Sequence, residues 1–198
     1  MFDMELQRRI RERKTPLALV LDPEAERLSE KLAQAEALRY HGTTLLDAAA
    51  GKLPAVVLQG ETYLSCGMMG ADVLANLISA AHAKGLYVIL DMEAAAPGCW
   101  AAYGADAVTV SPYGGSACLE AGGMLPIAAV RTGGQVQTLM AGDRALWLSV
   151  AEQMARRGAA LSVSTGYSLD VRDVRRSHPR AQADRLRGAR CGNLSPVL

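Results

Sequence analysis

Six short apolar runs alternate with helix-length segments, and this alternation restricts the fold more than any other feature of the sequence. Segments 70–84 and 145–157 carry apolar residues at helical spacing, and Gly85 is placed to end the first of them as a C-cap. Strands that alternate with helices are parallel, because parallel neighbours need a long crossover between them. Runs without polar alternation are typical of strands buried on both faces. The sequence therefore predicts an α/β protein with six β/α units, whose strands are residues 17–21, 55–58, 87–90, 107–110, 127–130 and 161–163.

The strand pattern weakens after Pro179. Residues 180–198 are basic and poor in β-branched residues, so we expect them to form an atypical C-terminal tail of a single domain, 1–198. A seventh strand there would be weak, and an eighth has no room. Six β/α units fit an open doubly wound sheet or a barrel, and a barrel would be incomplete, because a typical one needs roughly 250 residues. Its first and sixth strands would be open edges, which favour aggregation. We therefore expect an oligomer or the tail to cover the opening.

Charge and cysteine usage restrict the partners and the compartment. The chain has 21 basic and 20 acidic side chains and a formal net charge of +1, which argues against a broad surface for nucleic acid or membrane. Its four cysteines are widely spaced and form no C-x-x-C pair, which is typical of reduced thiols. The N-terminus is charged rather than apolar, and no apolar run approaches ~18 residues. We predict a soluble, cytoplasmic protein.

Motifs follow the ends of the predicted strands. They read LVLDP, VVLQGETYLSCGMMG, GADAVTVSPYGG and VRTGG. In this order and spacing they resemble the bacterial orotidine 5′-phosphate decarboxylases, over roughly residues 1–180. The resemblance implies a TIM-type (β/α) barrel, a homodimer or other oligomer that meets at the barrel mouth, a pyrimidine nucleotide as ligand and no cofactor. The positions it implies for substrate binding are Asp22, Gln59, Pro112, Tyr113 and Thr132.

The chain departs from this family where the family's chemistry takes place. The family signature Asp-x-Lys-x-x-Asp is replaced by Asp91-Met92-Glu93-Ala94-Ala95-Ala96, and the lysine of the family's Lys-Pro-Gln strand falls at Val57. Decarboxylation of an orotate requires a positioned cation that stabilises the developing carbanion and supplies a proton. An ionised Glu93 does neither. The family's Pro-Gly-x-Gly phosphate loop is unrecognisable as well, so the resemblance predicts a shortened pseudoenzyme that has lost standard decarboxylation.

Three carboxylates are the remaining candidates for chemistry. Because residues i and i+2 of a strand face the same side, Asp91 and Glu93 are expected to point together into the barrel mouth, near Asp22. They are a relic of an old site, or they hold Mg²⁺ or Mn²⁺, or they serve as acid and base. The first reading predicts a nucleotide-binding or protein-partner module related to UMP biosynthesis. The alternative is an active lyase, either a decarboxylase or a metal-dependent relative, that uses Asp22, Asp91 and Glu93.

Overall fold

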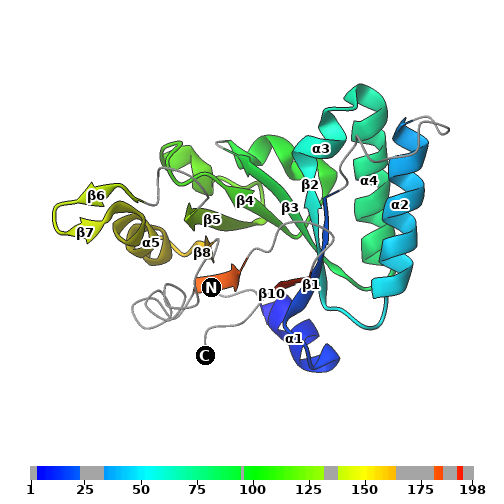
Figure 1. Cartoon of the computed structure of the whole chain (residues 1–198), viewed down its shortest axis with the longest axis horizontal. Coiled ribbons are helices and arrows are strands. Elements are labelled where there is room, and N and C mark those ends of the chain that lie inside the picture. Colours follow the sequence, from blue (N-terminus) through cyan, green and yellow to red (C-terminus); the bar gives the residue numbers. More distant parts are fainter. Residues whose placement is uncertain are drawn as a thin grey trace.

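A computed structural model gives the structure of the chain (Figure 1). It describes residues 4–22, 34–94, 96–131 and 138–163, together with the backbone of two short strands at 181–184 and 191–193.

Six parallel strands form a curled sheet that makes up most of a barrel. Each strand pairs in parallel with its neighbour, in the order in which the strands occur along the chain. Their positions confirm the six β/α units predicted from the apolar runs. The predicted and the observed strands differ only at their ends. The strands are β1 (Leu17–Leu21), β2 (Ala55–Gln59), β3 (Tyr87–Ala94), β4 (Ala107–Val110), β5 (Leu125–Arg131) and β8 (Ala160–Val163).

Two short strands from the C-terminal tail close the barrel. Strand β9 (Ala181–Asp184) lies parallel to β8, and β10 (Cys191–Asn193) runs antiparallel to both β9 and β1. The prediction that an eighth strand has no room was wrong. An antiparallel strand needs no helical crossover, and strands of four and three residues are too short to show an apolar run. The tail therefore covers the opening between β1 and β8, which is one of the two arrangements expected for it.

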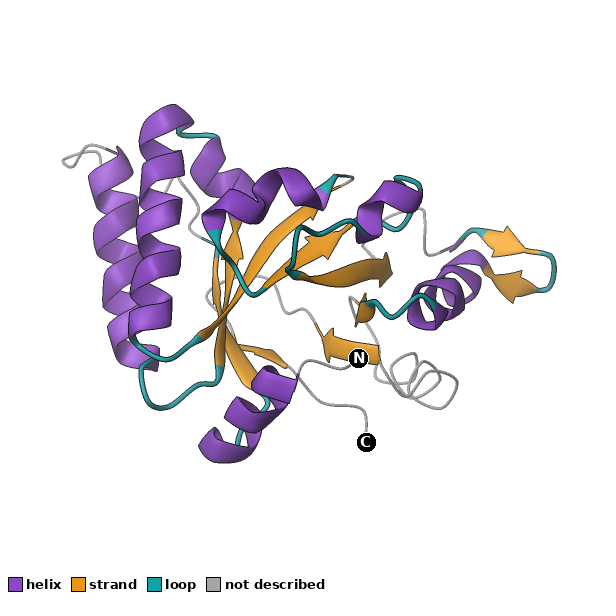
Figure 2. Ribbon diagram, turned by 180° about the vertical axis from the view of Figure 1, so that it is seen from behind, coloured by secondary structure: helices purple, strands orange, loops and turns teal. Residues whose placement is uncertain are grey.

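Helices cover the outside of the sheet (Figure 2). Helices α2 and α4 lie side by side against it, whereas β3 and β4 are followed by single 3₁₀ helices, η2 and η3. The predicted helix end is confirmed: Gly85, which follows the C-cap residue Lys84, has a φ of 71°, its N–H donates to the carbonyl of His82, and the Leu86 N–H donates to that of Ala81. A small hairpin, β6 (Met140–Ala141) and β7 (Arg144–Ala145), precedes α5. The helices are α1 (Met4–Arg13), α2 (Gln34–Ala49), α3 (Gly60–Leu64), α4 (Gly67–Ala83), η2 (Pro97–Tyr103), η3 (Ser116–Leu119) and α5 (Leu146–Arg156).

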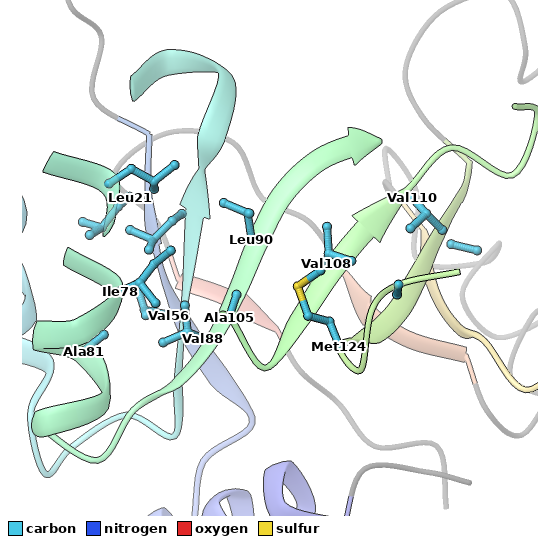
Figure 3. Packing of buried hydrophobic residues seen from close by; sticks show 14 of the residues in the cluster. Leu21, Val56, Ile78, Ala81, Val88, Leu90, Ala105, Val108, Val110 and Met124 are labelled. Atoms are coloured by element: carbon cyan, nitrogen blue, oxygen red, sulfur yellow. The ribbon is translucent and has the colours of Figure 1, made fainter. Parts of the chain in front are cut away.

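Apolar side chains fill two layers, one on each face of the sheet. The outer layer joins alternate strand residues such as Val88 and Val108 to helix residues such as Ile78 (Figure 3). The inner layer fills the N-terminal end of the barrel, where Leu6 and Ile10 of α1 pack against it. Its strand members are Ala18, Ala55, Tyr87, Ile89, Ala107, Ile127 and Ala160. Because this end is closed by apolar residues, the polar side chains that the structure describes inside the barrel lie toward the C-terminal ends of the strands, which we call the mouth.

Candidate functional site

Buried polar side chains gather toward the C-terminal ends of four successive strands. Among the described residues they are Asp91 on β3, Thr109 on β4, Arg131 on β5 and Ser162 on β8. Asp91 is only 1% exposed. Buried polar groups are costly unless they form hydrogen bonds, and this end of a β/α barrel is where such proteins place their functional residues. The mouth is therefore the candidate functional site.

Asp91 is the centre of a hydrogen-bonded cluster. Its Oδ2 accepts a hydrogen bond from Gln59 Nε2 at 2.6 Å, and its Oδ1 accepts one from the Thr109 hydroxyl. Gln59 and Asp91 are direct neighbours in the β2–β3 register, so the strand pairing itself brings them together. The Thr109 Oγ1 in turn accepts the backbone N–H groups of Met92 and Glu93, each at 3.0 Å. Gln59 and Asp91 were both predicted as site residues, and the structure places them in contact.

Glu93 does not follow the simple alternation expected for β3. Its φ is 43°, in the left-handed region, and the β3–β4 register shifts between Leu90 and Ala94. The rule that residues i and i+2 share a face applies to regular strands and fails at such a bulge. The described residues contain no group of three or more His, Cys, Asp or Glu that could hold a metal ion. Asp22, Asp91 and Glu93 therefore do not come together as the predicted alternative of a Mg²⁺ or Mn²⁺ site requires.

Asp22, at the end of β1, is engaged with α3. Its Oδ1 accepts a hydrogen bond from the Thr62 hydroxyl at 3.4 Å. Burial, and to a smaller extent the negative charge of Asp22, raise the pKa of the Tyr63 hydroxyl above its ordinary value. Asp22 thus lies at the rim of the barrel beside α3, and a role in ligand binding there stays a prediction.

The other predicted binding positions follow β4 and β5. Pro112 is half-buried, and the Tyr113 hydroxyl donates to the carbonyl of Val130 on β5 at 3.0 Å. Burial raises the pKa of Tyr113. This bond ties the loop after β4 to the neighbouring strand and leaves part of the ring exposed. Thr132 lies outside the described residues.

Two contacts near the mouth were not predicted from the sequence. The Arg131 guanidinium lies 5.5 Å from the centre of the Trp147 ring on α5, within the range of a cation–π interaction. Thr109 belongs to the GADAVTVSPYGG motif, but no role was predicted for it from the sequence. In the structure its hydroxyl organises the Asp91 cluster. The contact of Thr109 with Asp91 joins two β/α units, and that of Arg131 with Trp147 joins a strand to the helix that follows it, so spacing within one segment could not have revealed either.

Lysine is absent from the described part of the mouth. Of the four lysines in the chain, Lys14, Lys52 and Lys84 precede β1, β2 and β3, at the opposite end of the barrel. Lys84 pairs with Asp47 at 2.5 Å. The fourth, Lys31, lies outside the described residues. At the position of the family's first lysine, Val57 packs against the inner apolar layer.

A closed β/α barrel with buried polar residues at the C-terminal ends of its strands defines a TIM-type barrel protein. Within that class, the fold is the one found in orotidine 5′-phosphate decarboxylase structures, as predicted. The Leishmania donovani OMP decarboxylase superimposes with a TM-score of 0.74 at 23% identity, over 90% of this chain and 76% of that one. A Toxoplasma gondii protein assigned to the orotidine-monophosphate decarboxylases gives 0.80 at 20% identity, over 91% and 77%.

A third similar structure is the Leishmania donovani UMP synthase, with a TM-score of 0.74 at 23% identity. The match covers 92% of this chain and 44% of the synthase. Neither protein-family models nor curated protein sequences match the chain. At these identities the likeness establishes the fold. In the described part of the chain, none of the helices combines the length and apolar character needed to cross a membrane.

Proposed function

We propose that this chain is a non-decarboxylating relative of the orotidine 5′-phosphate decarboxylases that binds a pyrimidine nucleotide at the barrel mouth. One observation carries the proposal: the buried Asp91 carboxylate is fixed by Gln59 and Thr109 in a mouth whose described residues include no lysine. The likeness of the fold to orotidine 5′-phosphate decarboxylases supports a role related to pyrimidine (UMP) biosynthesis, in which a non-catalytic member would bind the nucleotide or a protein partner.

The chemistry of decarboxylation explains why the missing lysines matter. Loss of carbon dioxide from an orotate leaves a carbanion, which a nearby ammonium group stabilises and protonates. Val57 offers neither charge nor proton, and Glu93, which stands at the position of the signature lysine, carries no positive charge. By contrast, a fixed carboxylate with amide and hydroxyl neighbours is suited to hydrogen-bond the hydroxyl and N–H groups of a nucleoside.

The proposal predicts that purified protein does not convert orotidine 5′-phosphate, measured as loss of orotate absorbance, and that Glu93→Ala is equally inactive. The same preparation should bind UMP saturably in calorimetry. Lys31→Ala is the control for a lysine outside the described residues. Turnover by the wild type would contradict the proposed loss of decarboxylation. If Glu93→Ala abolished that turnover, the lyase alternative would be favoured. If Lys31→Ala abolished it, Lys31 would be the missing cation. Absence of both turnover and UMP binding would leave the protein-partner role.

We also propose that the chain forms a homodimer through the mouth. Exposed large apolar side chains in the segments after β2 and β4 support this: Met68 and Met69 in the first turn of α4, and Tyr113. All three follow the C-terminal ends of strands and therefore lie on the mouth side. Exposed apolar groups on one face are typical of association surfaces.

Met68→Lys is therefore expected to shift the protein from dimer to monomer in light scattering coupled to gel filtration, because a charged group would be buried without a partner at the interface. Met68 is 86% exposed, and Tyr40 on α2 is 71% exposed, so Tyr40→Lys is the matched control and should leave the mass unchanged. A wild-type monomer, or equal effects of the two substitutions, would contradict a mouth-to-mouth dimer.

A cytoplasmic location is part of the same proposal. Cys66, Cys99 and Cys118 are free thiols in the described structure, which is the usual state in a reducing compartment.

A further inference from the structure

Three lysines line the end of the barrel opposite the mouth. Strands β1, β2 and β3 pair in parallel, so the segments that precede them lie at the same end of the sheet. Each segment carries one lysine, three or four residues before its strand begins to pair: Lys14, Lys52 and Lys84. Helix α1 lies at this end, below β1 in Figure 1, and its Arg9 guanidinium donates a hydrogen bond to the carbonyl of Gly85. The last turn of α1, which is basic, is thereby held near the lysines.

Four exposed cations at this end have no ion-pair partner in the part of the chain that the structure describes. They are Arg11, Arg13, Lys14 and Lys52. The neighbouring carboxylates are already engaged, those of Glu5 and Glu12 by Arg8 and that of Asp47 by Lys84. The four cations, which we call the basic end, therefore concentrate positive charge locally in a chain whose formal net charge is only +1.

Lys14 has a backbone conformation that favours glycine. It follows α1 directly, and its φ of 52° lies in the left-handed region. Four other helices are followed within two residues by a residue with positive φ, and each time this residue is a glycine: Gly51 after α2, Gly85 after α4, Gly104 after η2 and Gly158 after α5. Residues other than glycine in this region are strained and cluster at functional positions. A lysine where glycine would be less strained therefore indicates a use for its side chain.

We propose that the basic end is a docking surface for an acidic segment of a protein partner. This inference goes beyond the proposed function, because it concerns the opposite end of the barrel and does not depend on a nucleotide at the mouth. A dimer that meets at the mouth leaves the basic end open in both subunits. Carboxylates of a partner would form charge-assisted hydrogen bonds with the lysine and arginine side chains. Complementary charges of this kind speed association and make it sensitive to salt.

The surroundings of the basic end favour a protein over a nucleic acid or a membrane. Proteins hold single-stranded nucleic acid with aromatic side chains on which the bases stack. The exposed aromatic residues that the structure describes are Tyr40, in the first half of α2, and Tyr113, at the mouth. A helix that lies on a bilayer needs a free apolar face, whereas Leu6 and Ile10 of α1 are buried in the inner layer of the barrel. Charge is the property that remains for recognition, and it suits an acidic peptide segment.

Binding of a labelled decaglutamate peptide to the full-length protein, followed by fluorescence anisotropy in ~0.15 M salt, tests the inference. We expect saturable binding that weakens as salt is added. Lys14→Gly should weaken it about threefold, as expected for one exposed ion pair. The same substitution should raise the midpoint of urea denaturation, because glycine relieves the left-handed strain. Combined with Lys52→Gln, it should weaken binding about tenfold.

Arg39→Gln is the matched control. It removes one positive charge from α2, where Arg39 pairs with Asp72, and should leave peptide binding unchanged. Absence of saturable peptide binding by the wild type, an affinity that Lys14→Gly leaves unchanged, or equal weakening by Arg39→Gln overturns the inference. Tighter binding of a decauridine RNA or of phosphatidylserine vesicles than of the peptide also overturns it, in favour of that class of partner. Calorimetry with UMP separates the two proposals, since loss of UMP binding with intact peptide binding contradicts only the proposed function.

Discussion

Gly70→Ala is expected to destabilise the protein by at least about 3 kcal/mol, near the upper end of what overpacking produces. A Cβ at Gly70 would lie 1.9 Å from the backbone carbonyl oxygen of Tyr63 and 2.8 Å from the Cβ of Cys66. The first contact is with a backbone atom, which cannot rotate away, so the clash is relieved only if α3 shifts against α4. A change of this size is a large fraction of the roughly 5–15 kcal/mol that stabilises a typical domain. Urea denaturation followed by circular dichroism measures it.

The same motif contains a matched control. Gly67 has a φ of 66°, and a Cβ added there would have no neighbouring atom within 4 Å. Gly67→Ala therefore meets only the strain of the left-handed conformation, about 1–2 kcal/mol. Equal destabilisation by the two substitutions would show that α3 and α4 do not pack as closely as described. A larger loss of stability in Gly70→Ala than in Gly67→Ala would show that close packing requires the glycine at 70, whereas only the backbone conformation favours the one at 67.

Asp91→Ala is expected to reduce the free energy of unfolding by about 2–3 kcal/mol. The change removes the acceptor for both the Gln59 amide and the buried Thr109 hydroxyl, and hydrogen bonds to a charged group contribute about 1.5–3 kcal/mol each. Loss of a buried charge partly offsets this. Asp91→Asn should lose no more than about 1 kcal/mol, because the cluster can be rebuilt around an amide.

Asp22→Ala is the control for a carboxylate at the rim. Its one described hydrogen bond, from Thr62, is long at 3.4 Å, and the side chain is half-buried. We expect a loss below about 1 kcal/mol in the same urea titration. If Asp91→Ala proves as harmless as Asp22→Ala, the Asp91 cluster does not contribute to stability as its burial suggests.

The six parallel strands could be predicted well from the sequence because their signal is strong. A strand buried on both faces must be apolar throughout, so the runs at 55–58 and 107–110 are visible without any knowledge of their neighbours. The TIM-type barrel was predicted from the motifs that follow the ends of the strands. The closing strands β9 and β10 were not predicted, because segments as short as AQAD and CGN contain no apolar run.

The candidate site was predicted only in part, because its residues are brought together partly by regular strand register and partly by a bulge and tertiary contacts. Register is regular between β2 and β3, so the pairing of Gln59 with Asp91 follows from strand order. The bulge between Leu90 and Ala94 breaks that regularity, so the alternation from which Asp91 and Glu93 were expected on one face does not apply there. The partner role of Thr109 depends on tertiary contact between β3 and β4, which no local pattern encodes.

Closure of the barrel by β10 has a consequence for the order of folding. Residues 17–19 pair with residues 191–193, nearly the full length of the chain apart, and contacts between such distant segments form slowly. The Asp91 cluster, in contrast, draws on residues 59–109, within three consecutive β/α units. The cluster can therefore assemble while β1 and β8 are still unpaired edges, and the interval before the tail docks is when the chain is most exposed to aggregation.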